Sequence, residues 1–115
     1  MSNAGCRDKD IPLMQRAESE MLDQGRDVKL VLRNDLALIA VQGPTMTKAL
    51  QPLTNVDLAK LYFMQSAVTT VCGVKNCRIT RCGYTGEDGV EISIPQDHVE
   101  KVVEALLESK NTKVI

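Results

Sequence analysis

Apolar residues recur at a helical spacing of three to four residues in three segments, which predicts three helices. The first begins near Asp10, a suitable N-cap, and ends near Gly25, a suitable terminator. The second opens at Pro44, which fits the first position of a helix. In the last segment Asp97 and Glu100 resemble a capping box. Its apolar stripe consists of Val99, Val102, Val103, Leu106 and Leu107.

Strand-like patterns fill the regions between these helices. Apolar and polar residues alternate over 28–33, a turn signal follows at Asn34-Asp35, and an apolar run covers 36–41, which together predict a hairpin. The remaining predicted strands cover 68–74, 77–82 and 90–94, with a connection at 73–76 between the first two. Because helices and hairpins intermix, we predict an α+β fold with a mixed, mainly antiparallel sheet and flanking helices.

The length and the charge distribution of the chain argue against a nucleic-acid-binding protein and a membrane-spanning protein. The chain has 115 residues, enough for one domain, and its 14 basic and 15 acidic residues are scattered rather than clustered. A nucleic-acid-binding protein usually shows a basic patch, and a membrane-spanning helix needs about 20 consecutive apolar residues. The first residues resemble neither a signal peptide nor an Arg-rich transit peptide. We therefore expect no nucleic-acid partner, no membrane partner and no targeting segment in this chain.

Four cysteines raise the question of a metal site. Zinc sites usually pair their ligands as C-x2-C to C-x4-C. Cys77 and Cys82 fall on one predicted strand, where an odd separation directs them to opposite faces and away from a shared ion. The single histidine, His98, lies near the last predicted helix. We therefore expect no metal ion and interpret the cysteines as buried structural residues.

The most informative stretch covers residues 78–94, in which Gly83, Gly86 and Gly89 are three residues apart. This spacing differs from the G-x-G-x-x-G fingerprint of dinucleotide sites, and no predicted helix follows it. The two acidic residues before the last glycine would also repel a phosphate group. The glycines by themselves predict a tight connection between two strands.

Glu91, Tyr84 and Asn3 are the candidate binding residues, and each also has an ordinary interpretation. Glu91 alternates with the apolar residues of strand 90–94, so it faces away from the core. It is either an exposed carboxylate or an acceptor of two parallel N–H bonds from a planar donor. Tyr84 is either a partly buried turn residue or an aromatic wall of a ligand pocket. Asn3 lies so near the N-terminus that spacing says nothing about it.

Residues 81–92 resemble a signature of the T-proteins, the aminomethyltransferases of the glycine cleavage system, which reads R-(C/S/T)-G-Y-T-G-E-x-G-(F/V)-E. Three further segments resemble the same family. Residues 2–6 resemble the S-N-A-G-C of the animal proteins, 35–44 their D-N-A-L-L-A-L-Q-G-P, and 63–67 their F-M-T-S-A. The segments follow one another in the family's order and at nearly its spacing, so the similarity covers essentially the whole chain. These segments resemble the animal mitochondrial form in particular.

The resemblance implies a function in glycine catabolism. In this family an aminomethyl group arrives on the lipoyl arm of the H-protein, and its one-carbon unit passes to tetrahydrofolate, giving 5,10-methylenetetrahydrofolate and ammonia. The implied partners are therefore lipoylated H-protein and tetrahydrofolate as a co-substrate, and the implied location is the mitochondrial matrix. Residues 1–115 would then be a partial folate-binding domain of the T-protein fold.

The resemblance also assigns roles to the three candidates. The family's glutamate that grips the pterin edge of folate corresponds to Glu91, the motif tyrosine to Tyr84, and the asparagine of S-N-A-G to Asn3. The family's key aspartate lies upstream of S-N-A-G, and an arginine that it also uses lies beyond the last helix, so neither has a counterpart here. We therefore assign no catalytic residue and expect the isolated chain to lack transferase activity and to bind folate weakly or not at all.

Three other functions remain open from the sequence. Dimethylglycine and sarcosine dehydrogenases carry T-protein-like C-terminal regions behind a flavin domain, although the S-N-A-G-C and G-Y-T-G-E-D-G segments favour T-protein. Folate-binding proteins of iron–sulfur assembly carry a K-G-C-Y-x-G-Q-E type motif, which differs from residues 81–87. The third is a non-catalytic interaction fragment, with strand edges and apolar surface exposed.

Overall fold

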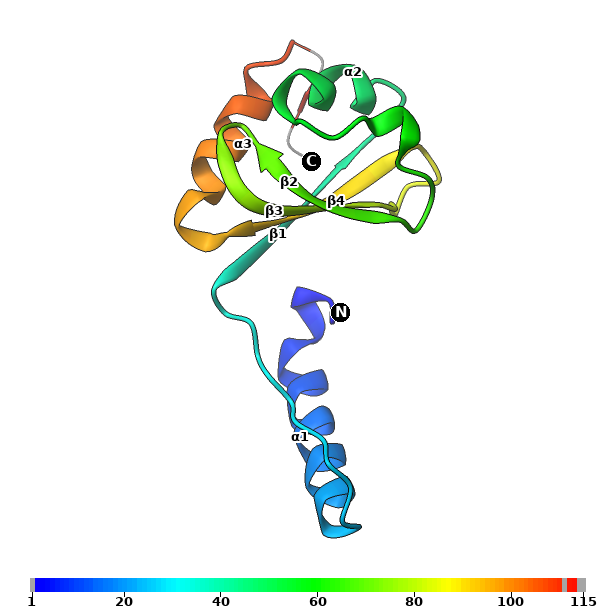
Figure 1. The fold of residues 1–115 in the computed structure, drawn as a ribbon, viewed down its shortest axis with the longest axis vertical. Helices are drawn as coiled ribbons and strands as arrows, with labels where there is room; N and C mark the ends of the chain where they lie inside the picture. The colour runs from blue at the N-terminus through cyan, green and yellow to red at the C-terminus, as the bar shows by residue number, and fades with distance from the viewer. Residues whose placement is uncertain (1, 111, 114–115) are drawn as a thin grey trace. The chain divides into compact units, whose positions relative to one another are not determined.

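The structure of the chain is a computed structural model that describes residues 2–110 and 112–113. It forms two compact units, Met1–Arg33 and Asn34–Ile115, each with its own elements (Figure 1). The first unit contains the 3-10 helix η1 (Ala4–Cys6) and the helix α1 (Arg7–Asp23). The described strands all belong to the second unit.

Helix α1 ends as the sequence predicts but begins earlier. Gly25, with a φ of +73°, ends it in a Schellman motif, in which its N–H bonds to the carbonyl of Leu22 and the next N–H bonds to the carbonyl of Met21. The predicted N-cap at Asp10 was wrong, because the helix begins at Arg7. Asp10 instead lies in the first turn, where an acidic side chain interacts favourably with the positive end of the helix.

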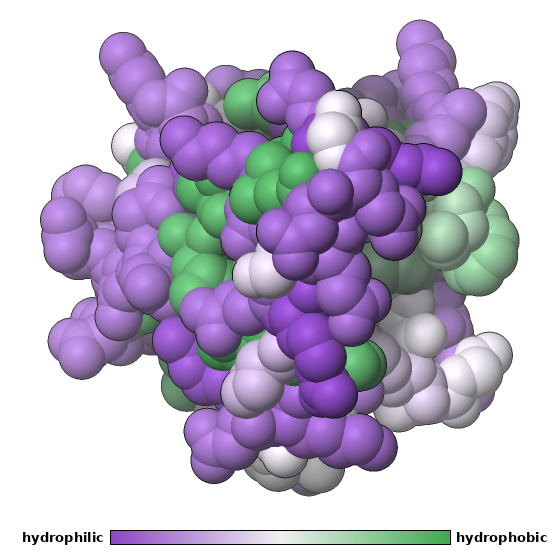
Figure 2. All heavy atoms as spheres, turned by 90° about the horizontal axis from the view of Figure 1, so that it is seen from below, coloured by the Kyte–Doolittle hydropathy of each residue, from purple (hydrophilic) through white to green (hydrophobic). Residues whose placement is uncertain are grey.

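Apolar side chains of α1 reach the surface. None of its residues is buried, and Leu13 and Leu22 are about half exposed. Figure 2 shows a face on which hydrophilic residues dominate and hydrophobic residues show between them. In the part of the chain that the structure describes, no helix has the length and hydropathy needed to cross a membrane.

The second unit is built on a four-stranded sheet with the order β1-β4-β3-β2 (Figure 1). Every neighbouring pair is antiparallel. The strands are β1 (Leu36–Gln42), β2 (Ser66–Val71), β3 (Val74–Arg81) and β4 (Gly89–Pro95). Together with its helices, this sheet confirms the predicted α+β class.

The predicted hairpin between 28–33 and 36–41 was wrong. Residues 28–33 form no strand, and β1 pairs instead with β4, with Ile39 opposite Ile92. Val31 and Leu32 are exposed, so the alternation in their segment does not mark a buried face. The strand that pairs with β1 comes from far along the chain, and a local pattern does not report such a partner.

A two-residue turn joins β2 to β3. Both residues, Cys72 and Gly73, have positive φ angles, +51° and +77°, as in the type I′ turn that matches the twist of paired strands. The sequence predicts this connection at 73–76, but the turn lies at 72–73. Cysteine does not commonly adopt the left-handed region, so no sequence signal marks a turn that begins at Cys72. Asn76, also with a positive φ of +61°, falls inside β3.

Two helices of the second unit cover one face of the sheet (Figure 1). They are α2 (Met46–Leu50), continued by η2 (Gln51–Leu53), and α3 (Val99–Leu107), preceded by η4 (Gln96–His98), while η3 (Leu58–Lys60) precedes β2. The predicted capping box at Asp97 and Glu100 was wrong. The N-cap position of α3 is His98, which makes no side-chain capping bond, because the 3-10 turn η4 leads directly into the helix.

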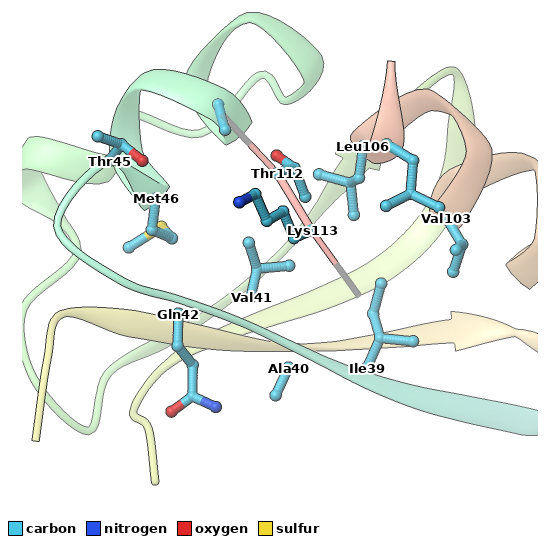
Figure 3. Close-up of a pocket in the computed structure, with 12 residues that line it drawn as sticks. Ile39, Ala40, Val41, Gln42, Thr45, Met46, Val103, Leu106, Thr112 and Lys113 are labelled. Atoms are coloured by element: carbon cyan, nitrogen blue, oxygen red, sulfur yellow. The ribbon is translucent and has the colours of Figure 1, made fainter. Parts of the chain in front are cut away.

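The core lies between these helices and the sheet. Its buried members include Met46, Leu50, Val102 and Leu106 from the helices and Ile79, Val90, Ile92 and Ile94 from the strands. Beside it, β1, α2 and α3 line a cavity of about 450 Å³ (Figure 3). The side chains of Ile39 and Val41 lie on the helix side of β1, whereas that of Gln42 extends to the opposite side. β1 therefore presents the apolar side chains of Ile39 and Val41 to the helices. It presents Gln42 to the opposite side of the sheet.

We expect Leu106→Ala to lower the free energy of unfolding by about 2–5 kcal/mol, because Leu106 is 4% exposed and its truncation leaves a void in the core. Leu107→Ala, at the next residue of the same helix, is the matched control. Leu107 is 41% exposed, so its truncation should change the stability by less than about 1 kcal/mol. Urea denaturation followed by circular dichroism measures both values. Equal losses in the two variants would contradict this packing.

Candidate functional site

Glu91 lies in the middle of β4, on the face of the sheet opposite to the helices. Its neighbours in the chain, Val90 and Ile92, are fully buried in the core, as the alternation predicts. Glu91 is nevertheless only 8% exposed. Paired strands flank it on both sides, with Ala40 of β1 and Thr80 of β3 as its cross-strand neighbours. The structure therefore shows a largely buried Glu91 rather than an exposed carboxylate, and its role as an acceptor for a planar donor stays a prediction.

The hydroxyl group of Tyr84 donates a hydrogen bond to Oε1 of Glu91. Tyr84 lies in the turn between β3 and β4, and the residue remains 66% exposed. This hydrogen bond, followed by desolvation and the negative charge of Glu91, raises the pKa of Tyr84. The phenol is therefore neutral at neutral pH and acts as a donor. Two of the residues selected from the sequence are thus in direct contact.

Cys82 is a further neighbour of this carboxylate. Burial raises the pKa of the Cys82 thiol, and so does the negative charge of Glu91. The sulfur therefore stays protonated at neutral pH. The thiol donates its hydrogen bond to the carbonyl of Thr80 at 3.6 Å, so the neutral donor to the Glu91 carboxylate is the phenol of Tyr84.

The cysteines show no arrangement suited to a metal ion. Cys77 is buried in β3, and Cys82 follows the end of that strand rather than lying on it as predicted. Burial is also the largest cause that raises the pKa of Cys72 and of Cys77. Among the residues that the structure describes, no group of three or more His, Cys, Asp or Glu side chains could hold a metal.

The guanidinium group of Arg81 clamps the turn that follows β3. It donates to both carboxylate oxygens of Asp88, at 2.7 Å from Nε and 2.5 Å from Nη2, and to the carbonyl of Leu58 at 2.7 Å. The backbone also closes the turn, since the N–H of Cys82 bonds to the carbonyl of Gly89 at 3.1 Å. A bidentate Arg–carboxylate pair fixes geometry as well as charge, so the turn is held at both ends.

Gln42, the last residue of β1, holds the same turn from another strand. Its Oε1 accepts the backbone N–H of Tyr84 at 2.5 Å and the hydroxyl of Thr85 at 3.4 Å. The packing leaves no room for side chains at two of the motif's glycines. A Cβ on Gly83 would lie 2.9 Å from Oε1 of Gln42, and one on Gly89 would lie 3.1 Å from a backbone oxygen. A Cβ at either position would therefore crowd its neighbours, whereas Gly86, with a φ of +78°, is the glycine of this turn that adopts the left-handed backbone.

Asn3, the third residue selected from the sequence, belongs to the first unit, whereas Glu91 and Tyr84 belong to the second. Asn3 occupies the N-cap position of η1, where its carbonyl accepts the N–H of Cys6 at 2.9 Å and its side chain makes no capping bond. The site that the structure brings together therefore consists of residues of the second unit.

Sequence analysis did not select Gln42, Arg81, Asp88 or Cys82 as contributors to the site. A signal for the Arg81–Asp88 pair is present in the motif, where opposite charges flank the glycines. Gln42 gives a weaker signal, as the polar residue that ends a continuous apolar run. Its partner in the turn is known only from the fold.

The sequence matches the profile of the GCVT N-terminal domain over residues 1–114. It is 54% identical to the mitochondrial aminomethyltransferase of Canis lupus familiaris and 52% identical to that of Homo sapiens, in each case over 99% of the chain. It is 43% identical to the mitochondrial aminomethyltransferase of Pisum sativum over 97% of the chain. The chain spans 27–28% of the length of these relatives, little more than a quarter.

We expect Glu91→Ala to lower the pKa of Tyr84, because it removes the hydrogen bond and the charge that raise it. Ultraviolet absorbance of the ionised phenol measures the change, in a Tyr62→Phe background where Tyr84 is the one remaining tyrosine. Glu87→Ala is the control. It removes an exposed carboxylate of the same turn and should leave the pKa of Tyr84 unchanged. An unchanged pKa in Glu91→Ala would contradict the Tyr84–Glu91 contact.

The same contact predicts how stability depends on pH. A pKa that is higher in the folded state than in the unfolded state means that the folded state holds its proton more tightly. The stabilisation is then complete below the ordinary tyrosine pKa of about 10 and is lost as the pH rises through the raised pKa. Tyr84→Phe should therefore lose stability less steeply than the wild type in that range, as urea denaturation at several pH values would measure. Identical slopes for the two proteins would contradict the prediction.

Proposed function

Since the chain belongs to the GCVT N-terminal domain family, we propose that it forms part of the folate-binding domain of an aminomethyltransferase. The proposed reaction transfers the one-carbon unit of an aminomethyl group from the lipoyl arm of H-protein to tetrahydrofolate. It yields 5,10-methylenetetrahydrofolate, ammonia and the dihydrolipoyl arm. Lipoylated H-protein and tetrahydrofolate are the proposed partners. The proposed location is the mitochondrial matrix, in keeping with the mitochondrial names of the relatives.

The shielded carboxylate of Glu91 carries this proposal. A carboxylate removed from water needs hydrogen-bond donors, and the side-chain hydrogen bonds of the described residues give Glu91 one neutral donor, the hydroxyl of Tyr84. The pterin head of a folate offers two parallel donors, its ring N–H and its exocyclic amine, which match the two oxygens of a carboxylate. An ionised carboxylate has about four lone-pair positions, so the hydroxyl of Tyr84 leaves positions for such a ligand.

The position of Glu91 on an interior strand also supports the proposal. The residues opposite Glu91 are Ala40 on one side and Thr80 on the other, so the backbone that carries the carboxylate is paired along both edges. A group held in this way is already ordered before a ligand arrives. Binding then costs less conformational entropy than it would at a mobile side chain.

Tyr84 and Asn3 complete the proposed set of folate contacts. The hydroxyl of Tyr84 orients the carboxylate, and its exposed ring offers an aromatic surface to the ligand. The role of Asn3 is supported by its place in the S-N-A-G sequence alone. No catalytic residue is proposed for this chain, so its part in the reaction is to hold and orient the folate.

Calorimetric titration of 5-formyltetrahydrofolate into the chain tests the proposal. Glu91→Ala should weaken binding by about 1.5–3 kcal/mol, the usual contribution of a hydrogen bond to a charged group. Glu87→Ala is the matched control, because it removes the other glutamate of the motif, which is exposed and is not proposed to touch the ligand. Its affinity should equal that of the wild type.

Two results would count against the proposal in different ways. An affinity of Glu91→Ala equal to that of the wild type would remove Glu91 from the site. A chain that is folded by circular dichroism and binds no 5-formyltetrahydrofolate would show that these residues do not form a folate site by themselves.

A further inference from the structure

We infer that Gln42 is a positioning residue for the Glu91 site, where its amide oxygen holds the turn so that the phenol of Tyr84 reaches the carboxylate of Glu91. The consequence for folate affinity rests on the proposed function. The positioning itself rests on the contacts within the second unit and can be measured without a ligand.

The turn needs an acceptor that the sheet does not provide. Pairing between β3 and β4 ends at Arg81 opposite Val90, and one more backbone bond joins Cys82 to Gly89. The N–H of Tyr84 lies beyond this ladder and bonds instead to Oε1 of Gln42 at 2.5 Å. A side chain of β1 thus takes the place of a backbone partner at the residue whose phenol contacts Glu91.

Gln42 is well placed for this role. It lies opposite Gly89 in the β1–β4 pair, and Ala40, two residues earlier on β1, lies opposite Glu91. Since side chains two residues apart share a face, Gln42 and Glu91 lie on the same side of the sheet as diagonal neighbours. Figure 3 shows the Gln42 side chain extending away from Val41 and the helices.

The glycines of the motif make the contact possible. Gly83 approaches Oε1 of Gln42 so closely that a Cβ would lie 2.9 Å from it, and a Cβ on Gly89 would lie 3.0 Å from Cγ of Gln42. The same oxygen also accepts the hydroxyl of Thr85 at 3.4 Å. The amide of Gln42 therefore contacts the backbone and a side chain of the turn at successive residues.

Two substitutions separate the acceptor role of Gln42 from its shape. Gln42→Met keeps the length and most of the volume but provides no strong acceptor. Gln42→Glu keeps an oxygen acceptor at the same distance along the side chain. If Gln42 merely fills space, the methionine variant should behave as the wild type, whereas the glutamate variant adds a negative charge that by itself raises the pKa of a nearby phenol. If Gln42 positions the turn, the methionine variant alone should lose the Tyr84–Glu91 contact.

The first measurement is the titration of Tyr84 by ultraviolet absorbance in the Tyr62→Phe background, with circular dichroism recorded over the same pH range. Gln42→Met should shift the midpoint downward, toward the ordinary tyrosine value of about 10, whereas Gln42→Glu should keep it raised. Should Gln42→Met fail to fold, Gln42→Asn replaces it, because the shorter side chain withdraws the amide by one methylene. A folded Gln42→Met or Gln42→Asn variant with the wild-type midpoint would overturn the inference.

The second measurement is the affinity for 5-formyltetrahydrofolate. Gln42→Met should weaken binding about 2- to 10-fold, the effect of one neutral hydrogen bond, and Gln42→Glu should restore most of it. If the wild-type chain binds no folate, these residues do not form a folate site by themselves and the link to binding fails, while the titration of Tyr84 still decides the role of Gln42. A Gln42→Met variant that lowers the titration midpoint of Tyr84 and yet binds 5-formyltetrahydrofolate as tightly as the wild type does would overturn the proposed effect of Gln42 on folate binding.

Discussion

The pairing of β4 along both of its edges is the constraint on which the site depends. It directs Val90 and Ile92 into the core under the helices and leaves Glu91 between two neighbouring strands. A carboxylate on an edge strand would be hydrated from the open side, whereas this one is shielded by the residues beside it. Burial of such a group is unfavourable unless donors surround it. The turn that follows β3 supplies a donor, the hydroxyl of Tyr84, so the order of the strands and the composition of the turn are linked.

The sequence was sufficient for features that depend on neighbouring backbone. Alternation along β4 placed Glu91 away from the core, because successive side chains of a strand point to opposite faces. Gly25 ended α1 as expected, since a Schellman motif uses bonds within a few residues. The α+β class followed from the same local patterns.

The features that were wrong or missed depend on distant partners. A strand was predicted at 28–33 because its residues alternate, yet β1 pairs with β4. The low exposure of Glu91 could not be predicted either, because it depends on which strands flank β4. Gln42 and Tyr84 are 42 residues apart in the chain, so no spacing rule connects them. The resemblance to T-proteins assigned roles to residues for which these patterns gave none. The roles of Glu91, Tyr84 and Asn3 in binding remain predictions.

The thiol beside Glu91 has a consequence for the chemical durability of the site. Oxidants and alkylating reagents attack the thiolate form of cysteine, and the rate follows the fraction of thiolate and its accessibility. Burial and the charge of Glu91 keep Cys82 protonated, while Cys6 in the first unit is exposed. Reagents that modify cysteine would thus find Cys82 in its unreactive form. The carboxylate that accepts the hydrogen bond of Tyr84 therefore also adds to the effect of burial and lowers the thiolate fraction of Cys82.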